Sequence, residues 1–106
     1  MARTAKLLAQ GALSTTITAH YTAPASTTAQ ITEIYFANTG ATTRTISVYA
    51  GGTYSTNSVI VGLSVTGTSS IIIQDTKIVL ATTKVLAVKQ DVGTDIICTI
   101  FGVEET

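Results

Sequence analysis

Tryptophan is absent from this sequence, and proline, cysteine and histidine each occur once in 106 residues. The lone Cys98 excludes an intramolecular disulfide, and the lone His20 excludes a metal site built from several histidines. Scarce proline, with 45% hydrophobic residues, argues against a disordered chain. We therefore expect a folded domain stabilised by its own core, in which Cys98 is a small buried hydrophobe.

Charge is also scarce. Only 11% of the residues are charged, and six basic residues balance six acidic ones. No basic stripe is present, so nucleic acid is not expected as a partner. No apolar run is long enough to span a bilayer, and the N-terminal segment lacks the sustained apolar core of a signal peptide. We therefore expect no membrane partner and synthesis in a cytoplasm.

Threonine, by contrast, is abundant, with 22 copies. Thr, Val and Ile are stiff at χ1 and pack well on a pleated surface, so this composition favours strands over helices. A chain of this length forms one domain by the usual size relation. The composition thus predicts a β-sandwich or barrel.

Short alternating runs separated by turn residues recur along the chain. Residues 29–38 place Ile34 and Phe36 on one face and Tyr35 on the other, and residues 95–103 alternate in the same way. Residues 44–50 are expected to turn Ile46 and Val48 inward and Thr45, Ser47 and Tyr49 outward.

The second half of the chain continues this rhythm. Residues 58–65 are apolar enough to predict a mostly buried strand, and residues 71–73 and 77–80 are expected to be separate strands divided by Gln74-Asp75. The whole pattern predicts an all-β, single-domain antiparallel β-sandwich, jelly-roll-like, with about seven or eight strands over residues 15–106. Residues 1–14 are expected to form an extended N-terminal arm or an edge strand, which either pairs with its own sheet or clamps a neighbouring subunit.

The residue pattern predicts no catalytic, cofactor-binding or metal site, so we expect a protein that is not an enzyme. No Gly-x-Ser-x-Gly elbow surrounds any serine, and His20 lies in an alternating segment. Asp75, Asp91 and Asp95 stand at turn signals, where Asp is favoured for local backbone hydrogen bonds. Asp91 and Asp95 flank one turn and are candidate Ca²⁺ ligands, although turn chemistry explains them better.

Tyrosines are the more informative side chains. Tyr35 and Tyr49 are both expected to point outward on one sheet face, as an interface hot spot or a sugar-stacking platform, although ordinary cross-strand pairing explains them equally well. Tyr54 lies in a Ser/Thr-rich loop. The candidate interface residues are Arg3, Lys6, Leu7, Leu8, Tyr35, Tyr49 and Tyr54.

Several short motifs follow one another along the chain: Leu8-Ala9-Gln10-Gly11, Tyr21-Thr22-Ala23-Pro24-Ala25, Asn38-Thr39-Gly40, Arg44-Thr45-Ile46-Ser47-Val48-Tyr49 and Gly102-Val103-Glu104. In this order and spacing they resemble a family of small virion proteins of tailed bacteriophages. The similarity covers nearly the whole chain, except for the loop at residues 50–57.

The resemblance implies a compact β-sandwich on the outer surface of a phage head, or alternatively on the tail. It implies a decoration or cement protein that binds across major capsid protein subunits and stabilises the head. The alternative is a tail or fibre accessory module that binds a receptor or carbohydrate. Expected partners are the major capsid protein and copies of the chain itself, as a homodimer or homotrimer.

Overall fold

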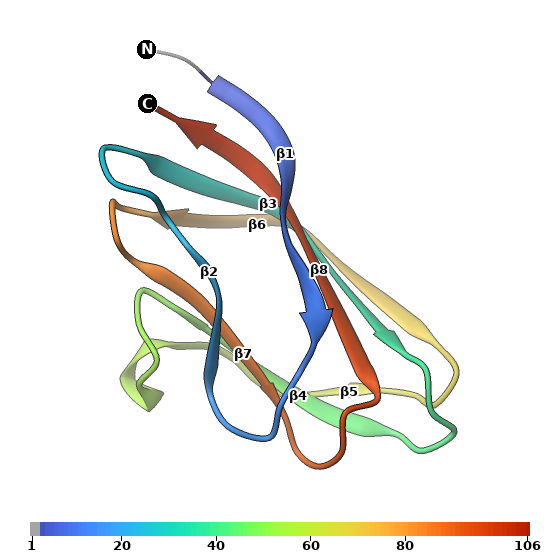
Figure 1. The fold of residues 1–106 in the computed structure, drawn as a ribbon. Helices are drawn as coiled ribbons and strands as arrows, with labels where there is room; N and C mark the ends of the chain where they lie inside the picture. The colour runs from blue at the N-terminus through green and yellow to red at the C-terminus, as the bar shows by residue number, and fades with distance from the viewer. Residues whose placement is uncertain (1–2) are drawn as a thin grey trace.

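The computed structural model describes residues 3–106 and consists of two four-stranded antiparallel sheets packed face to face (Figure 1). Within the described residues the only helical element is a 3₁₀ turn, Ser55–Asn57. The strands are β1 (Arg3–Ala12), β2 (Thr18–Thr22), β3 (Thr28–Asn38), β4 (Arg44–Ala50), β5 (Ser58–Val65), β6 (Ser70–Leu80), β7 (Val85–Gln90) and β8 (Ile96–Glu105).

The strand order is that of a jelly roll. One sheet has the order β1-β8-β3-β6 and the other β2-β7-β4-β5. Strand β1 therefore pairs with β8, β2 with β7, β3 with β6 and β4 with β5, as if one long hairpin had been rolled into a sandwich. This nesting brings the first strand beside the last: Arg3 lies opposite Glu105, and β1 and β8 run side by side in Figure 1. The predicted antiparallel, jelly-roll-like β-sandwich is confirmed.

The core between the sheets follows the predicted alternation on β3 and β8, whereas on β4 Ser47 and Tyr49, expected to point outward to solvent, are buried. Ile34 and Phe36 are fully buried while Tyr35 between them points outward, and Ile96, Cys98 and Ile100 are buried on β8. Each such side chain contributes about 1.5–3 kcal/mol by leaving water. The largest buried side chains are Phe36, Leu13, Ile31, Ile34, Ile46, Leu80, Leu86, Ile96, Ile100, Gln90, Val48 and Val65.

The N-terminal segment is a strand of the chain's own sheet. β1 pairs with β8 from Arg3 to Ala12, with one bulge between Leu7 and Ala9. Residues 1–14 were expected to form either an extended arm or an edge strand. Within the described residues, Arg3–Ala12 forms an edge strand. Residues 1 and 2 lie outside the described part of the chain.

Strand β6 corrects one prediction. Residues 71–73 and 77–80 are not separate strands, because both halves pair with β3. Between the pairs Glu33–Gln74 and Ile31–Ile78, three residues of β6 face one of β3, so the predicted division is a wide bulge within one strand.

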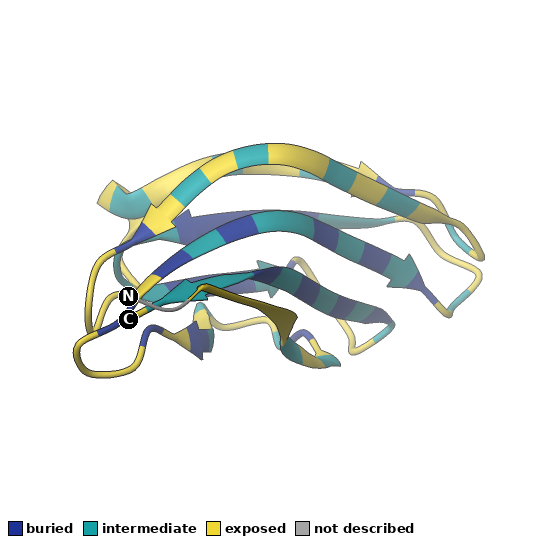
Figure 2. Ribbon diagram, turned by 90° about the horizontal axis from the view of Figure 1, so that it is seen from above, coloured by how far each residue is buried: buried dark blue, intermediate teal, exposed yellow. Residues whose placement is uncertain are grey.

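Strand β5 corrects another prediction. Its apolar sequence predicts burial, but five of its eight residues are exposed and only Val65 is buried. The reason is position: β5 pairs with β4 alone and forms the edge of its sheet. In Figure 2 the strands β5 and β6 are coloured exposed and intermediate along most of their length. The fold thus leaves an apolar strand at its surface.

Candidate interaction surfaces

Apolar side chains cross the outer face of the β1-β8-β3-β6 sheet. Leu7 on β1 lies opposite Phe101 on β8, and Tyr35 on β3 lies opposite Ile72 on β6. The rings of Tyr35 and Phe101 meet edge to face, with centroids 5.4 Å apart and planes at 77°. Leu7 and Ile72 are each about half exposed. We call Leu7, Phe101, Tyr35 and Ile72 the outer patch; it spans all four strands of the sheet.

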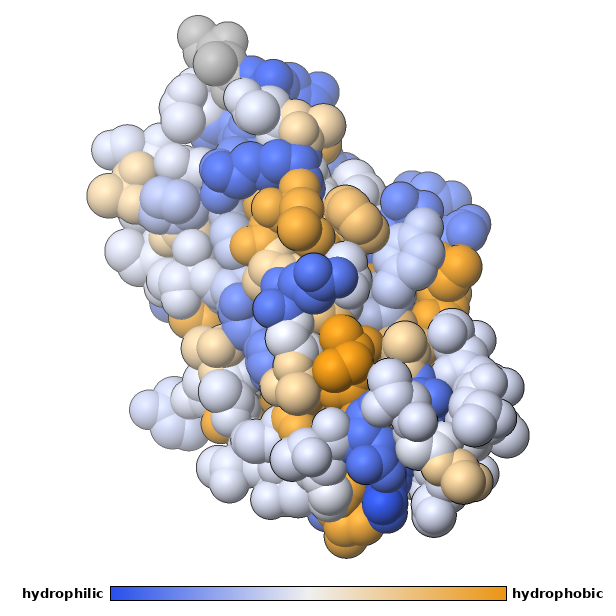
Figure 3. Space-filling model, turned by 45° about the vertical axis from the view of Figure 1, so that its right-hand side comes forward, coloured by the Kyte–Doolittle hydropathy of each residue, from blue (hydrophilic) through white to orange (hydrophobic). Residues whose placement is uncertain are grey.

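The outer patch has polar neighbours around its apolar centre. Glu33 lies opposite Phe101 and Gln74, and Thr99 lies opposite Tyr35. A shallow hollow beside Leu7 and Phe101 is lined also by Lys6, Thr32, Glu33 and Val103. In Figure 3 apolar side chains lie in several clusters along the middle of the molecule, with hydrophilic ones between them. A patch of this composition suits contact with another protein surface.

The other N-terminal candidates have different surroundings. Arg3 forms an exposed ion pair with Glu105, Nε to Oε2 at 3.1 Å. Leu8, the extra residue of the β1 bulge, packs against the core instead of facing solvent. Of the candidate interface residues on β1, only Leu7 thus belongs to the apolar outer surface.

The expectation that Tyr35 and Tyr49 share an exposed face is wrong. Tyr35 is on β3 of one sheet, whereas Tyr49 is on β4 of the other and is only 5% exposed. β3 and β4 are consecutive in the sequence but belong to different sheets, so residues that face outward from them lie on opposite sides of the molecule. Tyr54, by contrast, is 72% exposed in the β4–β5 loop, just before the 3₁₀ turn.

One edge of the sandwich is closed by a polar bridge between the sheets. The Tyr21 hydroxyl on β2 donates a hydrogen bond of 2.5 Å to Glu104 Oε2 on β8, and Lys6 Nζ on β1 lies 2.7 Å from Glu104 Oε1. The hydrogen bonds from Lys6 and Tyr21 lower the pKa of Glu104, because both stabilise the carboxylate. Burial and the neighbouring carboxylate raise the pKa of Tyr21 above its usual value.

The opposite edge is open. Here β5 and β6 bound an apolar groove of about 370 Å³. Residues on the groove floor, such as Ile60, Ile73 and Ile78, are half-buried and pack against the core. We call this hollow the β5–β6 groove; its lining residues are Ala50, Val59, Ile60, Ile73, Thr76, Lys77, Ile78 and Val79.

Exposed valines lie at this open edge. Val59 and Val79, 51% and 61% exposed, line the β5–β6 groove, and Val61 on β5 is 75% exposed. Sequence reasoning missed all three, because an apolar run normally signals burial. Residues 58–65 contain no charged residue, which is also typical of a buried strand, so the sequence carried no signal that would have placed these valines at the surface.

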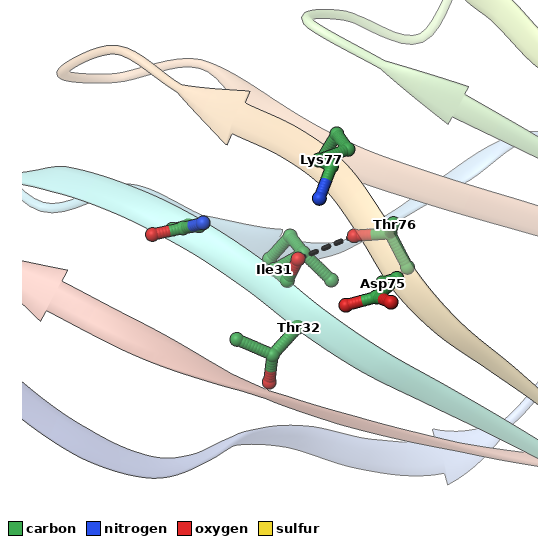
Figure 4. Close-up of a pocket in the computed structure, with 6 residues that line it drawn as sticks. Ile31, Thr32, Asp75, Thr76 and Lys77 are labelled. Carbon is green, nitrogen blue, oxygen red and sulfur yellow. Dashed lines mark hydrogen bonds between the residues drawn. The ribbon is translucent and has the colours of Figure 1, made fainter.

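A small polar pocket lies beside the β6 bulge (Figure 4). Its volume is about 60 Å³, and the Thr76 hydroxyl closes one side by donating a hydrogen bond to the Ile31 carbonyl. Asp75 and Lys77 adopt left-handed φ values of 53° and 58°, which lets β6 bulge away from β3 and rejoin it. The bulge explains this pocket as a packing feature of the sheet.

The loops at one end of the sandwich are joined by Arg44 and Asp95. Arg44 Nη2 and Nε donate to Asp95 Oδ2 at 2.9 and 3.0 Å, and the Thr39 hydroxyl donates to the Asp95 carbonyl. Asp91, the other Ca²⁺ candidate, accepts a hydrogen bond from the Val92 amide through its side chain. Both carboxylates are thus used in local structure, and the described residues contain no cluster of three or more metal-ligating side chains.

The reactive side chains are dispersed. Burial lowers the pKa of His20 on β2, and within the described chain its Nε2 is buried without a hydrogen-bond partner. Cys98 lies in the core, where burial raises the pKa of its thiol to about 12. A thiol with so high a pKa is protonated and unreactive at neutral pH.

No helix within residues 3–106 is long and apolar enough to cross a membrane. Comparison of the chain with protein-family models, with curated proteins and with solved structures found no match.

Proposed function

We propose that this protein is a non-enzymatic structural protein of a tailed-phage virion, a decoration or cement protein that binds across major capsid protein subunits. The proposal rests on the motif resemblance and on one structural observation, the outer patch. Jelly rolls are common in viral capsid proteins, although the fold itself hosts many functions.

The outer patch supports this role through its shape and chemistry. The outer patch lies on four hydrogen-bonded strands that are already ordered. A partner that binds it therefore causes little loss of conformational entropy in this chain. The outer patch offers an aromatic pair, Tyr35 and Phe101, flanked by Leu7 and Ile72. Aromatic residues are enriched in the buried centres of protein interfaces. Repeated over many symmetric sites, even modest binding to the assembled shell stabilises it by mass action.

The copy number of the chain per particle tests the proposal. Quantitative mass spectrometry of purified virions is expected to find a number comparable with that of the major capsid protein. Absence from virions would refute the virion assignment, and a small number matching a tail symmetry would refute the head assignment.

A binding assay tests the surface. Leu7→Glu places a charge in the outer patch, and Val92→Glu places the same charge on an exposed valine of the β7–β8 loop. Heads stripped of the protein are expected to rebind the wild type and the Val92 variant but not the Leu7 variant. Equal binding by all three proteins would show that the outer patch does not contact the capsid.

The second candidate function is a tail or fibre accessory module that binds a carbohydrate receptor. The observation that favours it is Tyr54, whose ring is exposed in a loop and available for stacking on a sugar. A glycan array separates the two functions: saturable binding that Tyr54→Ala abolishes supports the receptor module, and a cement protein shows none.

A further inference from the structure

We propose that the open edge of the sandwich, the β5–β6 groove with its exposed valines, binds the same edge of a second copy of this chain about a two-fold axis. This surface is separate from the outer patch, so the proposal stands independently of the virion function.

The first argument is the unusual exposure of β5. Natural sheets protect an edge strand with bulges, charged residues, proline or a covering element. β5 has bulges but no charged residue and no proline, and it exposes Val59 and Val61. Bulges hinder backbone pairing but leave these apolar side chains uncovered, so the edge calls for a partner that covers them.

The second argument comes from the backbone of the two edge strands. β5 breaks register with β4 twice, between Ile46 and Val48 and between Val48 and Tyr49, and Gly62 has a left-handed φ of 72°. β6 bulges at Asp75 and Lys77. Bulged edges are poor templates for adding another strand, so a partner meets this edge through side chains. Endless strand addition, which leads to fibres, is disfavoured for the same reason.

The third argument is that one surface carries both a projection and a hollow. Val59 and Val79 are exposed at the β5–β6 groove, whose floor is formed by Ile60, Ile73 and Ile78. A two-fold axis turns one copy so that its projecting valines face the groove of the other. Such self-complementarity is what an isologous dimer requires.

Charge does not oppose this arrangement. Lys77 is the only charged residue that lines the groove, and the exposed Asp75 lies two residues away with the opposite charge. Among the described residues neither forms an ion pair. The chain as a whole has no net charge, so two copies approach without overall repulsion.

The available area is sufficient for a weak dimer. The eight residues of β5 extend about 26 Å at roughly 3.3 Å per residue. With the shortest dimension of the molecule, 19 Å, the edge presents about 500 Å² per copy, or about 1,000 Å² in total. This is the lower limit for a specific interface, so we expect association that depends on concentration.

Sedimentation analysis of the purified chain over a wide concentration range tests the proposal. Wild type is expected to shift from monomer to dimer as concentration rises. Val59→Glu, which would bury a charge in the contact, is expected to lose the dimer, whereas Val92→Glu, an equally exposed valine elsewhere, is expected to keep it. Circular dichroism confirms that both variants fold.

Hydrogen exchange supplies a second measurement that needs no variant. Amides of β5 and β6 are expected to gain protection in concentrated wild-type protein, while those of β1 and β2 at the closed edge are unchanged. A monomer at every concentration, a dimer that survives Val59→Glu, or an open-ended series of oligomers would each overturn the proposal.

Discussion

The polar bridge at the closed edge offers the sharpest test of how this sandwich is held together. Tyr21→Phe removes one hydroxyl and leaves the ring in place, so it deletes the hydrogen bond to Glu104 with little change in packing. Net contributions of hydrogen bonds to charged groups are about 1.5–3 kcal/mol. Because the bridge is only partly buried, we expect a loss in the free energy of unfolding of about 1.5–2 kcal/mol, or roughly 10 °C in the melting temperature.

The effect should depend on pH in a defined direction. The folded pKa of Glu104 is lowered, so the stability that its carboxylate contributes is fully present above its unfolded pKa near 4.5. It is lost as the pH falls through the folded pKa. A protonated carboxyl accepts a hydrogen bond about half as strong, so the difference between wild type and Tyr21→Phe should shrink by roughly half in acid.

Urea unfolding followed by circular dichroism, at neutral pH and in acid, measures both quantities. Tyr54→Phe is the control, because Tyr54 is exposed and its hydroxyl makes no hydrogen bond within the described residues; its stability should stay within about 0.5 kcal/mol of wild type. Two results would refute the reasoning: a Tyr21 variant as stable as the control, or a destabilisation that is the same at both pH values.

Three further predictions concern the core, a strand and a loop. The Cys98 thiol, with a pKa near 12, should resist a thiol reagent in native protein and react fully in denaturant; fast native labelling would contradict its burial. Burial lowers the pKa of His20, so below about pH 6.5 the unfolded chain takes up a proton before the folded chain does. The free energy of unfolding should therefore fall as the pH drops below this value. His20→Gln should reduce this pH dependence, measured by urea unfolding at several pH values. Gly67→Ala places a Cβ 2.2 Å from the Ala41 carbonyl oxygen and should cost about 1–3 kcal/mol, whereas Gly11→Ala, whose Cβ meets nothing within 4 Å, should be nearly neutral; equal melting temperatures would refute the close approach.

Much of the fold could be predicted because strand alternation is a local property. Ile34 and Phe36 are inward and Tyr35 outward whatever their strand pairs with, since successive side chains point to opposite faces. The same holds for Cys98 on β8. Turn residues mark most strand ends for equally local reasons, such as Asn38-Thr39-Gly40 after β3.

The interaction surfaces were predicted only in part. Leu7 and Tyr35 were candidates and do lie on one face, but Phe101 and Ile72 join them only through the pairing of four strands. Tyr49 failed as a candidate because its strand belongs to the other sheet. The sequence around a residue shows whether it lies in a strand. Which other residues share its sheet face depends on pairing between strands that are far apart in the sequence.

The amino-acid sequence by itself determined that this protein is an all-β sandwich, and which side chains of regular strands such as β3 and β8 face its core. Only the tertiary structure decided which strands lie at the edges. Rolling the chain as nested pairs puts β5 and β6 beside an open groove, while β1 and β2 flank the edge closed by Tyr21 and Glu104. The physical reason is that burial depends on what lies next to a strand in space, so the apolar sequence of β5 could specify a strand but not the neighbour that would cover it.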